Sequence, residues 1–338
     1  TQKSDMSFGA SIAQGWLEYS SKGLFGQPAN WVRPAFWRML LDILRFNRQA
    51  EHYLQAPPEV TLGQVLTDLR LGSWFRDYYL LAMGAAIWSC SVQTMLAYPA
   101  SSFIRFFKNH GLLTVNNQPQ WHTVSGGSRE YVKRLRARLN GQVKTGCGVT
   151  SVTRQAEGVE LTTADGQTQC FEQVVLAVHA DEALQLLANP SSAEREVLGS
   201  FEYQPNAAVT HCDGSFMPRR RSCWASWVYL SESKSDPRPV VSLTYWMNSL
   251  QGIPADNPVF ITLNPGRPPR PDLVYDRHVF SHPVFTTAAI QAQQRLPEIQ
   301  GQDHIWYVGA WQRHGFHEDG LLSAVTVAQQ MGIPPPWN

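Results

Sequence analysis

Charge and cysteine are both scarce in this chain of 338 residues. Charged residues make up 16% of the sequence and the formal net charge is +1, so the charge gives no argument for binding to nucleic acid. The basic run Arg219, Arg220 and Arg221 is isolated, and such a run is more typical of a solvated loop than of a phosphate-binding patch. The five cysteines are an odd number without metal-ligand spacing, which indicates a reducing compartment, and we therefore expect a cytoplasmic protein.

Long apolar runs are missing as well. No stretch approaches the length of a transmembrane helix, and no signal peptide is visible. Hydrophobic residues make up 43% of the chain, which is the composition of a globular protein, and the length is sufficient for two domains. The twelve tryptophans suit a roomy apolar pocket as well as a dense core.

Several catalytic signatures are absent. There is no GxSxG motif, and neither Cys90 nor Cys223 has the local pattern of an activated nucleophile, which argues against hydrolysis. A dinucleotide-binding GxGxxG is also missing, because the GxG formed by Gly146 and Gly148 lacks the later glycine.

The sequence contains two histidine patterns that could in principle ligate a metal ion. His278 and His282 are four residues apart, but they lack the glutamate of HExxH and lie in a predicted loop. The cluster at residues 314–319 could ligate a cation, yet the same residues belong to the motif described below. We expect no metal site.

Apolar periodicity predicts helices in the first third of the chain and strands in the middle. Short strands are expected at residues 6–12 and 16–19, followed by a helical block over 20–112 that includes a capping box at Thr61 and Gln64. A meander then leads into residues 174–178, a continuous apolar run typical of a central parallel strand. Four further apolar runs favour one antiparallel sheet: 207–211, 224–230, 240–247 and 259–263.

The most distinctive stretch is residues 305–331. An apolar run is followed by a loop with Gly315 and Gly320, and apolar residues then recur at helical spacing from Leu321 to Ala328. We expect a strand, a glycine loop and a helix that starts at about Gly320. The bare first turn of such a helix suits an anionic or electron-rich ligand edge, although an ordinary strand–helix connection is the alternative.

The segment 309–324, GAWQRHGFHEDGLLSA, resembles the C-terminal flavin-binding segment of the flavin-dependent amine oxidase superfamily. The likeness is greatest to a bacterial branch of amine-oxidase-like proteins predicted to bind NAD or FAD, and it extends over the chain from Asp5 onward. It implies an α/β flavoprotein fold of two domains, one FAD/NAD(P)-binding and Rossmann-like, the other an interleaved substrate domain of helices and antiparallel sheet. The implied parts are the strands and helical block of the substrate domain at 1–120, part of the FAD-binding domain at 121–200, the antiparallel sheet at 201–285 and the C-terminal FAD-binding segment at 286–333.

The resemblance also implies which residues hold the cofactor. In the superfamily the last helix faces the pyrimidine edge of the flavin, a glycine turn lies beside the ring, and a strand backbone meets the adenine. The corresponding cofactor-binding residues here are Gly126, Gly127, Ser128, Val149, Gly309, Ala310, Gly315, Phe316, Glu318, Asp319, Gly320, Leu321, Ser323 and Ala324. A substrate pocket is implied beside Trp88, Trp246, Asn248 and His317, and no catalytic residue is assigned.

The sequence departs from the superfamily at three points. Ala310 replaces an acidic residue, and Glu318 or Asp319 would take over its contact with the ribityl or pyrophosphate region of FAD. No lysine lies between Lys144 and Lys234, where many amine oxidases hold a lysine and a water over the flavin. No cysteine follows Cys223, so the C-terminal cysteinyl–flavin link of monoamine oxidases cannot form, and noncovalent FAD is expected.

The function implied by the resemblance is that of an FAD-dependent oxidoreductase. It would oxidise or desaturate a small or lipid-like organic substrate by hydride transfer to the flavin. Because the sequence begins at Thr1 and lacks GxGxxG, we expect a fragment truncated at its N-terminus, with the primary nucleotide-binding unit upstream. The alternative is a non-catalytic remnant of such a flavoprotein.

Overall fold

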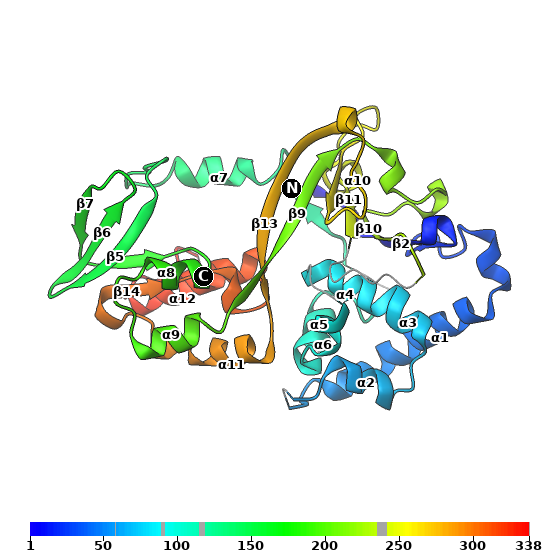
Figure 1. Ribbon diagram of the computed structural model, residues 1–338, viewed down its shortest axis with the longest axis horizontal. Helices are drawn as coiled ribbons and strands as arrows, with labels where there is room; N and C mark the ends of the chain where they lie inside the picture. The colour runs from blue at the N-terminus through cyan, green and yellow to red at the C-terminus, as the bar shows by residue number, and fades with distance from the viewer. Residues whose placement is uncertain (58, 89–91, 115–118, 235–241, 338) are drawn as a thin grey trace. The chain divides into compact units, whose positions relative to one another are not determined.

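The computed structural model describes residues 1–57, 59–88, 92–114, 119–234 and 242–337 (Figure 1). The chain forms two compact units: unit 1 is Thr1–Leu139 with Pro205–His282, and unit 2 is Asn140–Gln204 with Pro283–Asn338. Each unit thus draws on two segments of the chain, as interleaved domains do. The boundary predicted between residues 120 and 121 falls instead after Leu139, because β4 (His122–Thr123) pairs with β1 (Gln2–Lys3) of unit 1.

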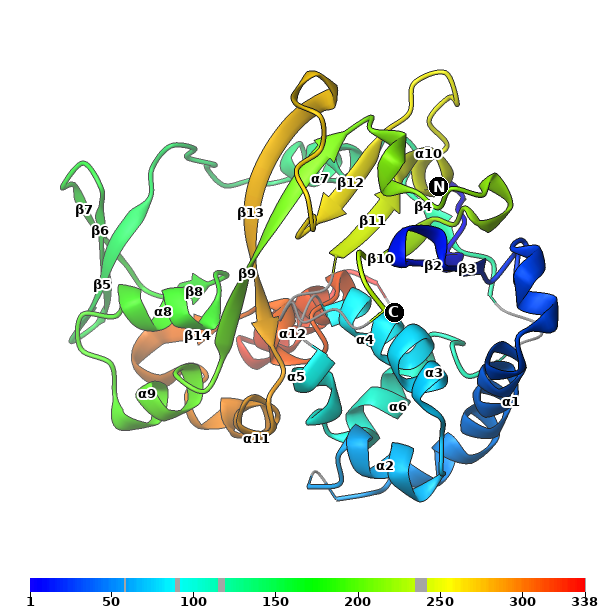
Figure 2. The same ribbon diagram turned by 45° about the vertical axis from the view of Figure 1, so that its right-hand side comes forward.

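The main sheet has seven strands in the order β13-β9-β12-β11-β10-β2-β3 (Figure 2). The four strands predicted to form one antiparallel sheet pair antiparallel in the order β9, β12, β11 and β10, which confirms that prediction. β2 extends this sheet in parallel with β10, and β3 pairs antiparallel with β2. The start of the strand predicted at 240–247 lies outside the described residues. The strands are β2 (Phe8–Ile12), β3 (Leu17–Ser20), β9 (Glu202–His211), β10 (Trp227–Ser231), β11 (Ser242–Trp246), β12 (Phe260–Leu263) and β13 (Val274–Val284).

Strand β13 corrects a second prediction. His278 and His282 were expected in a loop, but both lie in this strand of eleven residues. Most of its side chains are exposed or half-buried, and a strand without a buried face lacks the apolar alternation by which strands are recognised.

The helical block of unit 1 was predicted correctly. Thr61 and Gln64 form the expected capping box at the start of α2, with Thr61 Oγ1 accepting the Gln64 N–H at 3.3 Å and Gln64 Oε1 accepting the Thr61 N–H at 2.9 Å. A π turn, Arg76–Leu80, joins α3 to α4 and makes residues 73–88 one continuous helical segment. The helices of unit 1 are α1 (Pro34–Gln49), α2 (Leu62–Asp68), α3 (Ser73–Phe75), α4 (Leu81–Trp88), α5 (Val92–Leu96), α6 (Ala100–Asn109), α7 (Arg129–Arg136) and α10 (Met247–Gln251).

Unit 2 contains two small sheets. β5, β6 and β7 form an antiparallel meander, and β8 pairs with β14 in parallel. The strands are β5 (Val149–Gln155), β6 (Gly158–Thr163), β7 (Thr168–Phe171), β8 (Val174–Leu176) and β14 (Ile305–Tyr307). The helices are α8 (Ala180–Leu186), α9 (Ser192–Leu198), α11 (Thr287–Arg295) and α12 (His317–Gln330).

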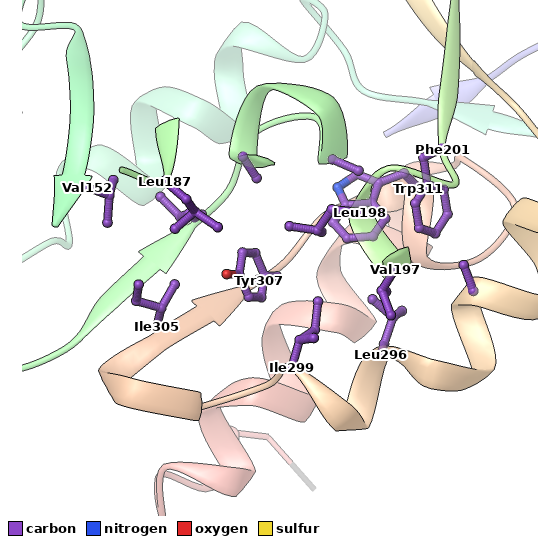
Figure 3. Close-up of a cluster of buried hydrophobic side chains, with 14 of the residues drawn as sticks. Val152, Leu187, Val197, Leu198, Phe201, Leu296, Ile299, Ile305, Tyr307 and Trp311 are labelled. Carbon is purple, nitrogen blue, oxygen red and sulfur yellow. The ribbon is translucent and has the colours of Figure 1, made fainter. Parts of the chain in front are cut away.

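The core of unit 2 is built around Tyr307 (Figure 3). This fully buried ring is surrounded by apolar side chains, and its hydroxyl donates a hydrogen bond of 2.5 Å to the buried carboxylate of Glu194. Arg154 contacts the same carboxylate oxygen. Burial alone would raise the pKa of Glu194, but the hydrogen bonds from Tyr307 and Ser191 and the charge of Arg154 lower it overall.

One face of the parallel pair is open. Val174 and Leu176 are buried in the core, whereas Val175, in the middle of β8, is 44% exposed. The run 174–178 therefore forms a parallel strand over Val174–Leu176, but in a sheet of two strands it is not the central strand that was expected, and one of its faces is open. No helix among the described residues is long and apolar enough to span a membrane.

Candidate functional site

The two parallel strands of unit 2 end side by side, at the edge where open α/β sheets bind their ligands. β8 leads into Val178 and β14 leads into Gly309. The indole Nε1 of Trp311 donates a hydrogen bond of 3.1 Å to the Val178 carbonyl and so ties the two loops together. A Cβ at Gly309 would lie 2.3 Å from the same Nε1, so glycine is required there by the packing of this chain itself.

Helix α12 begins at His317, not at about Gly320. The carboxylate of Asp319 explains the earlier start, because Oδ2 accepts the N–H groups of Phe316 at 3.0 Å and His314 at 3.3 Å and so caps the helix from within its first turn. Gly320 lies one turn into the helix, and its N–H is bonded to the Phe316 carbonyl. The N–H of Glu318 has no acceptor among the described residues.

The buried face of α12 is not the predicted apolar one. Asp319, Ser323 and Val327 are buried, whereas Leu321 and Leu322 are 48% and 38% exposed. Ser323 takes the core-facing position because its hydroxyl accepts the Gly309 N–H at 2.9 Å and donates to the Gly320 carbonyl at 2.7 Å. The two hydrogen bonds of the Ser323 hydroxyl thus fix α12 against the loop after β14, and Leu321 and Leu322 remain exposed near the start of the helix.

The backbone at Gly320 is accessible. A Cβ added there would meet only Ala310, at 3.7 Å from its nitrogen, which is an ordinary van der Waals contact. No close packing within the chain requires glycine at this position. Because Gly320 has no side chain, a ligand can approach its backbone closely. The start of α12 is therefore compatible with a bound flavin ring.

A cavity of about 710 Å³ lies along β8 in unit 2. Its walls are the exposed face of β8 at Val175, Ala177 just after this strand, and the start of β5 at Val149, where the β5–β6 register shifts by a bulge. The volume is within the range of small-molecule and cofactor sites. Val149, which the resemblance predicts as a cofactor-binding residue, therefore lines a cavity large enough for part of a dinucleotide cofactor. Pattern reasoning missed the wall from α8, formed by Glu182, Gln185 and Leu186.

The glycine turn Gly126, Gly127 and Ser128 lies in unit 1, whereas the other predicted cofactor residues, Val149 and those from Gly309 to Ala324, lie in unit 2. Both glycines have positive φ angles, 81° and 86°, which only glycine adopts readily. A Cβ at Gly127 would meet nothing within 4 Å. In unit 2, Gly315 also has a positive φ of 91° and packs against the ring of Phe285.

The four residues of the implied substrate pocket have different surroundings. Trp88 is 6% exposed, and its indole N–H has no hydrogen-bond acceptor among the described residues. Trp246 is half-buried, with its ring 5.2 Å from that of Trp224. His317 is exposed, in the first turn of α12 of unit 2, while the other three residues lie in unit 1.

Asn248 does not fit a substrate role. Its amide group donates to the carbonyls of Ile253, Pro254 and Asn257 and accepts the N–H of Val259 at 2.8 Å. These bonds engage both amide N–H groups and one acceptor site of the oxygen, so Asn248 anchors the loop between α10 and β12. A pattern of residue types could not reveal this, because the partners are backbone groups.

The two acidic residues predicted to contact FAD, Glu318 and Asp319, differ in burial and in hydrogen bonding. The carboxylate of Asp319 is 9% exposed and occupied by the cap and by Arg313 at 3.9 Å, whereas Glu318 is exposed and has no such bonds. No group of three or more His, Cys, Asp or Glu side chains that could hold a metal ion occurs among the described residues.

Comparison with known structures identifies the class of fold. An engineered putrescine oxidase matches 98% of this chain with a TM-score of 0.62 at 10% identity, over 82% of its own length. A CLA-producing fatty acid isomerase from P. acnes matches 98% of the chain with a TM-score of 0.64 at 12% identity, over 81% of its own length. The chain therefore has the α/β fold of the FAD-binding amine oxidases.

The sequence comparisons identify the family. The model of the flavin-containing amine oxidoreductases matches residues 47–252, and the chain belongs to this family. A protein of Mycobacterium tuberculosis (strain H37Rv) provisionally named flavin-containing monoamine oxidase AofH is 24% identical over 215 residues. That match covers 60% of this chain and 46% of the M. tuberculosis protein, so the chain spans about half of its relative's length.

Proposed function

We propose that this chain is part of an FAD-dependent oxidoreductase that oxidises or desaturates a small or lipid-like organic molecule. The observation that carries the proposal is the start of α12, where Asp319 caps the first turn and Ser323 fixes the helix to Gly309 after β14, with the backbone of Gly320 left accessible. The cavity along β8 supports a dinucleotide cofactor rather than a simple flavin, because it provides a second, separate space in the same unit.

When bound, FAD supplies a hydride acceptor at N5 of its isoalloxazine ring. The residues of the chain would position this group and stabilise charge. The N–H of Glu318 and the positive end of the α12 dipole favour negative charge at the N1–C2=O edge, with a contribution of up to about 2 kcal/mol in a partly buried site. Leu321 and Leu322, exposed in this structure, would exclude water from that edge. Ser323 acts as a positioning residue, since its hydroxyl bonds to the backbone of Gly309 and Gly320.

The proposed type of substrate is inferred from the surroundings of Trp88. A buried indole N–H without an acceptor is costly, and a polar atom of a substrate would satisfy it. The aromatic rings of Tyr98 and Phe106, 5.2 Å and 4.8 Å from Trp88, would supply an apolar wall. This environment suits a largely apolar substrate with one heteroatom.

Noncovalent attachment is supported by the cysteines. Cys223 is fully buried, and burial raises its pKa to about 11, so it is not a reactive thiolate at neutral pH. No cysteine follows it in the sequence. Acid precipitation of the protein expressed from its complete gene is expected to release the flavin into the supernatant, and flavin in the pellet would contradict noncovalent binding.

The variant Gly320→Val tests the assignment of α12. Its Cβ has room, and valine is no poorer a helix former than glycine, so the fold should retain its stability while a closely approaching ring is displaced. We expect lower FAD occupancy, or a reduction potential lowered by some tens of millivolts, since about 30 mV corresponds to roughly 1.4 kcal/mol for two electrons.

The matched control is Gly141→Val, because a Cβ at Gly141 of the same unit meets nothing within 4 Å. It should keep wild-type flavin content and potential. If Gly320→Val also keeps both, α12 does not face the flavin and the proposed site is wrong.

A further inference from the structure

A second cavity, of about 500 Å³, lies in unit 1, at the carboxyl ends of the parallel strands β2 and β10. Ser11 and Gln14 line it from the end of β2, and Ser231 and Glu232 from the end of β10. Its remaining walls come from residues 214–224 and from Arg267. All of these residues belong to unit 1.

The charge of the lining is positive. Arg219, Arg221 and Arg267 face the cavity, with Glu232 as the one acidic residue among the lining side chains. Glu232 lies 3.9 Å from Arg267, whose guanidinium donates to the carbonyl and hydroxyl of Ser215. The guanidinium groups of Arg219 and Arg221 form no ion pair with a carboxylate among the described residues. After the Arg267–Glu232 pair is cancelled, two positive charges remain.

A buried carboxylate fixes the loop that carries these arginines. Glu18, fully buried in β3, accepts the backbone N–H of Arg219 at 2.7 Å and of Arg220 at 3.3 Å, and pairs with the Arg220 guanidinium at 2.8 Å. Only the middle arginine of the run is thus neutralised within the fold. The side chains of Arg219 and Arg221 are exposed, as expected of a solvated loop, while the backbone of the turn is anchored to the sheet through Glu18.

Arg221 is held by aromatic rings. Its guanidinium carbon lies 3.7 Å from the centre of the Trp224 ring and 4.7 Å from that of Trp246. A guanidinium that stacks on a ring keeps its N–H groups in its own plane, where they can still bind an anion in bidentate fashion. The stacking therefore orients the charge without neutralising it, and Trp224 provides a flat apolar wall to the cavity.

The backbone next to the cavity is strained. Ala13 and Gln14, directly after β2, have positive φ angles of 48° and 53°. Such conformations are costly for residues other than glycine and cluster at functional sites. The side chain of Gln14, which lines the cavity, has no hydrogen-bond partner among the described residues and offers an amide to a ligand.

We propose that this cavity binds a small organic phosphate: a phosphate monoester with a planar apolar body. The phosphate would be bound by Arg219 and Arg221, and the body would lie against Trp224. The two uncompensated positive charges match the charge of a phosphate monoester, about −1.5 to −2 at neutral pH, better than that of a single carboxylate.

Isothermal titration with phenyl phosphate at low salt tests the proposal in the protein expressed from its complete gene. Saturable binding is expected, and the double variant Arg219→Gln/Arg221→Gln should weaken it at least tenfold, since two charge-assisted contacts are lost. The matched control is Arg134→Gln/Arg138→Gln, which removes the same charge from two exposed side chains, one in α7 and one just after it, in the same unit and should leave affinity within about twofold.

Titrations with three other compounds show how much the phosphate group and the aromatic ring each contribute to binding. Inorganic phosphate and benzoate are expected to bind more weakly than phenyl phosphate, and phenol is expected not to bind. The proposal is overturned if phenyl phosphate does not saturate by about 10 mM, the concentration of a weak, non-specific contact. It is also overturned if the two double variants lose affinity equally, or if inorganic phosphate or benzoate binds as tightly as phenyl phosphate. Urea unfolding of both double variants checks that folding is retained.

Discussion

The buried imidazole of His211 should make unit 1 sensitive to mild acid. This residue of β9 is fully buried, and its Nδ1 accepts the Asp213 N–H at 3.1 Å. Nε2 must therefore carry the proton and donate it to Thr262 Oγ1 at 2.8 Å. Protonation of Nδ1 would set two N–H groups against each other and bury a charge.

These contacts determine in which direction, and by how much, the free energy of unfolding changes with pH. Burial lowers the pKa of His211 from 6.5 to about 4, partly opposed by the charge of Asp213 and assisted by that of Arg267. Because the folded pKa is the lower one, the unfolded chain binds the proton first, and stability is lost as the pH falls below 6.5 and on through 4. Between pH 7 and pH 5 the loss from this group is about 2 kcal/mol.

The assay is urea unfolding, followed by tryptophan fluorescence from pH 7 to pH 5. His211→Asn keeps an acceptor near the position of Nδ1 but cannot titrate, so the variant should be less stable at pH 7 and lose less stability on acidification. A wild-type loss below about 0.5 kcal/mol, or an equal pH dependence in the variant, would refute the reasoning.

Three other substitutions have expected costs that urea unfolding can measure. Tyr307→Phe removes a donor from the buried Glu194 carboxylate and should cost about 1–3 kcal/mol at neutral pH, with a smaller further loss on acidification than in the wild type, because that donor helps to lower the pKa of Glu194 in the folded state. Thr61→Ala removes the capping box of α2 and should cost about 1 kcal/mol. Asn248→Ala breaks four bonds to backbone groups and should cost more than about 3 kcal/mol without changing flavin binding, and a selective loss of activity at full stability would contradict its structural role.

Local patterns in the sequence predicted the elements that depend on local interactions. The capping box of α2 involves residues three apart, and β2 is a short buried run made mostly of apolar residues. The long strand β13 was missed because its side chains are exposed and half-buried, and it is held by pairing with β9 across a large separation in the sequence.

The site was harder to predict, since polar contacts that apolar periodicity does not reveal decide which side chains are buried. Leu321 and Leu322 have the spacing of a core stripe, yet the bonds from Ser323 and Asp319 to the preceding loop turn other residues inward. The pairing of Glu18 with Arg220 joins residues about two hundred positions apart. No local signal in a single sequence distinguishes Arg220, which is neutralised, from its two neighbours.

The central claim is that this fold binds FAD, and it is tested most directly by the flavin content of the protein expressed from its complete gene. The account predicts an absorption spectrum of bound flavin, about one FAD per chain released by acid, and a clear loss of that FAD in Gly320→Val but not in Gly141→Val. A well-folded wild-type protein that contains no flavin and takes none up from added FAD would contradict the account.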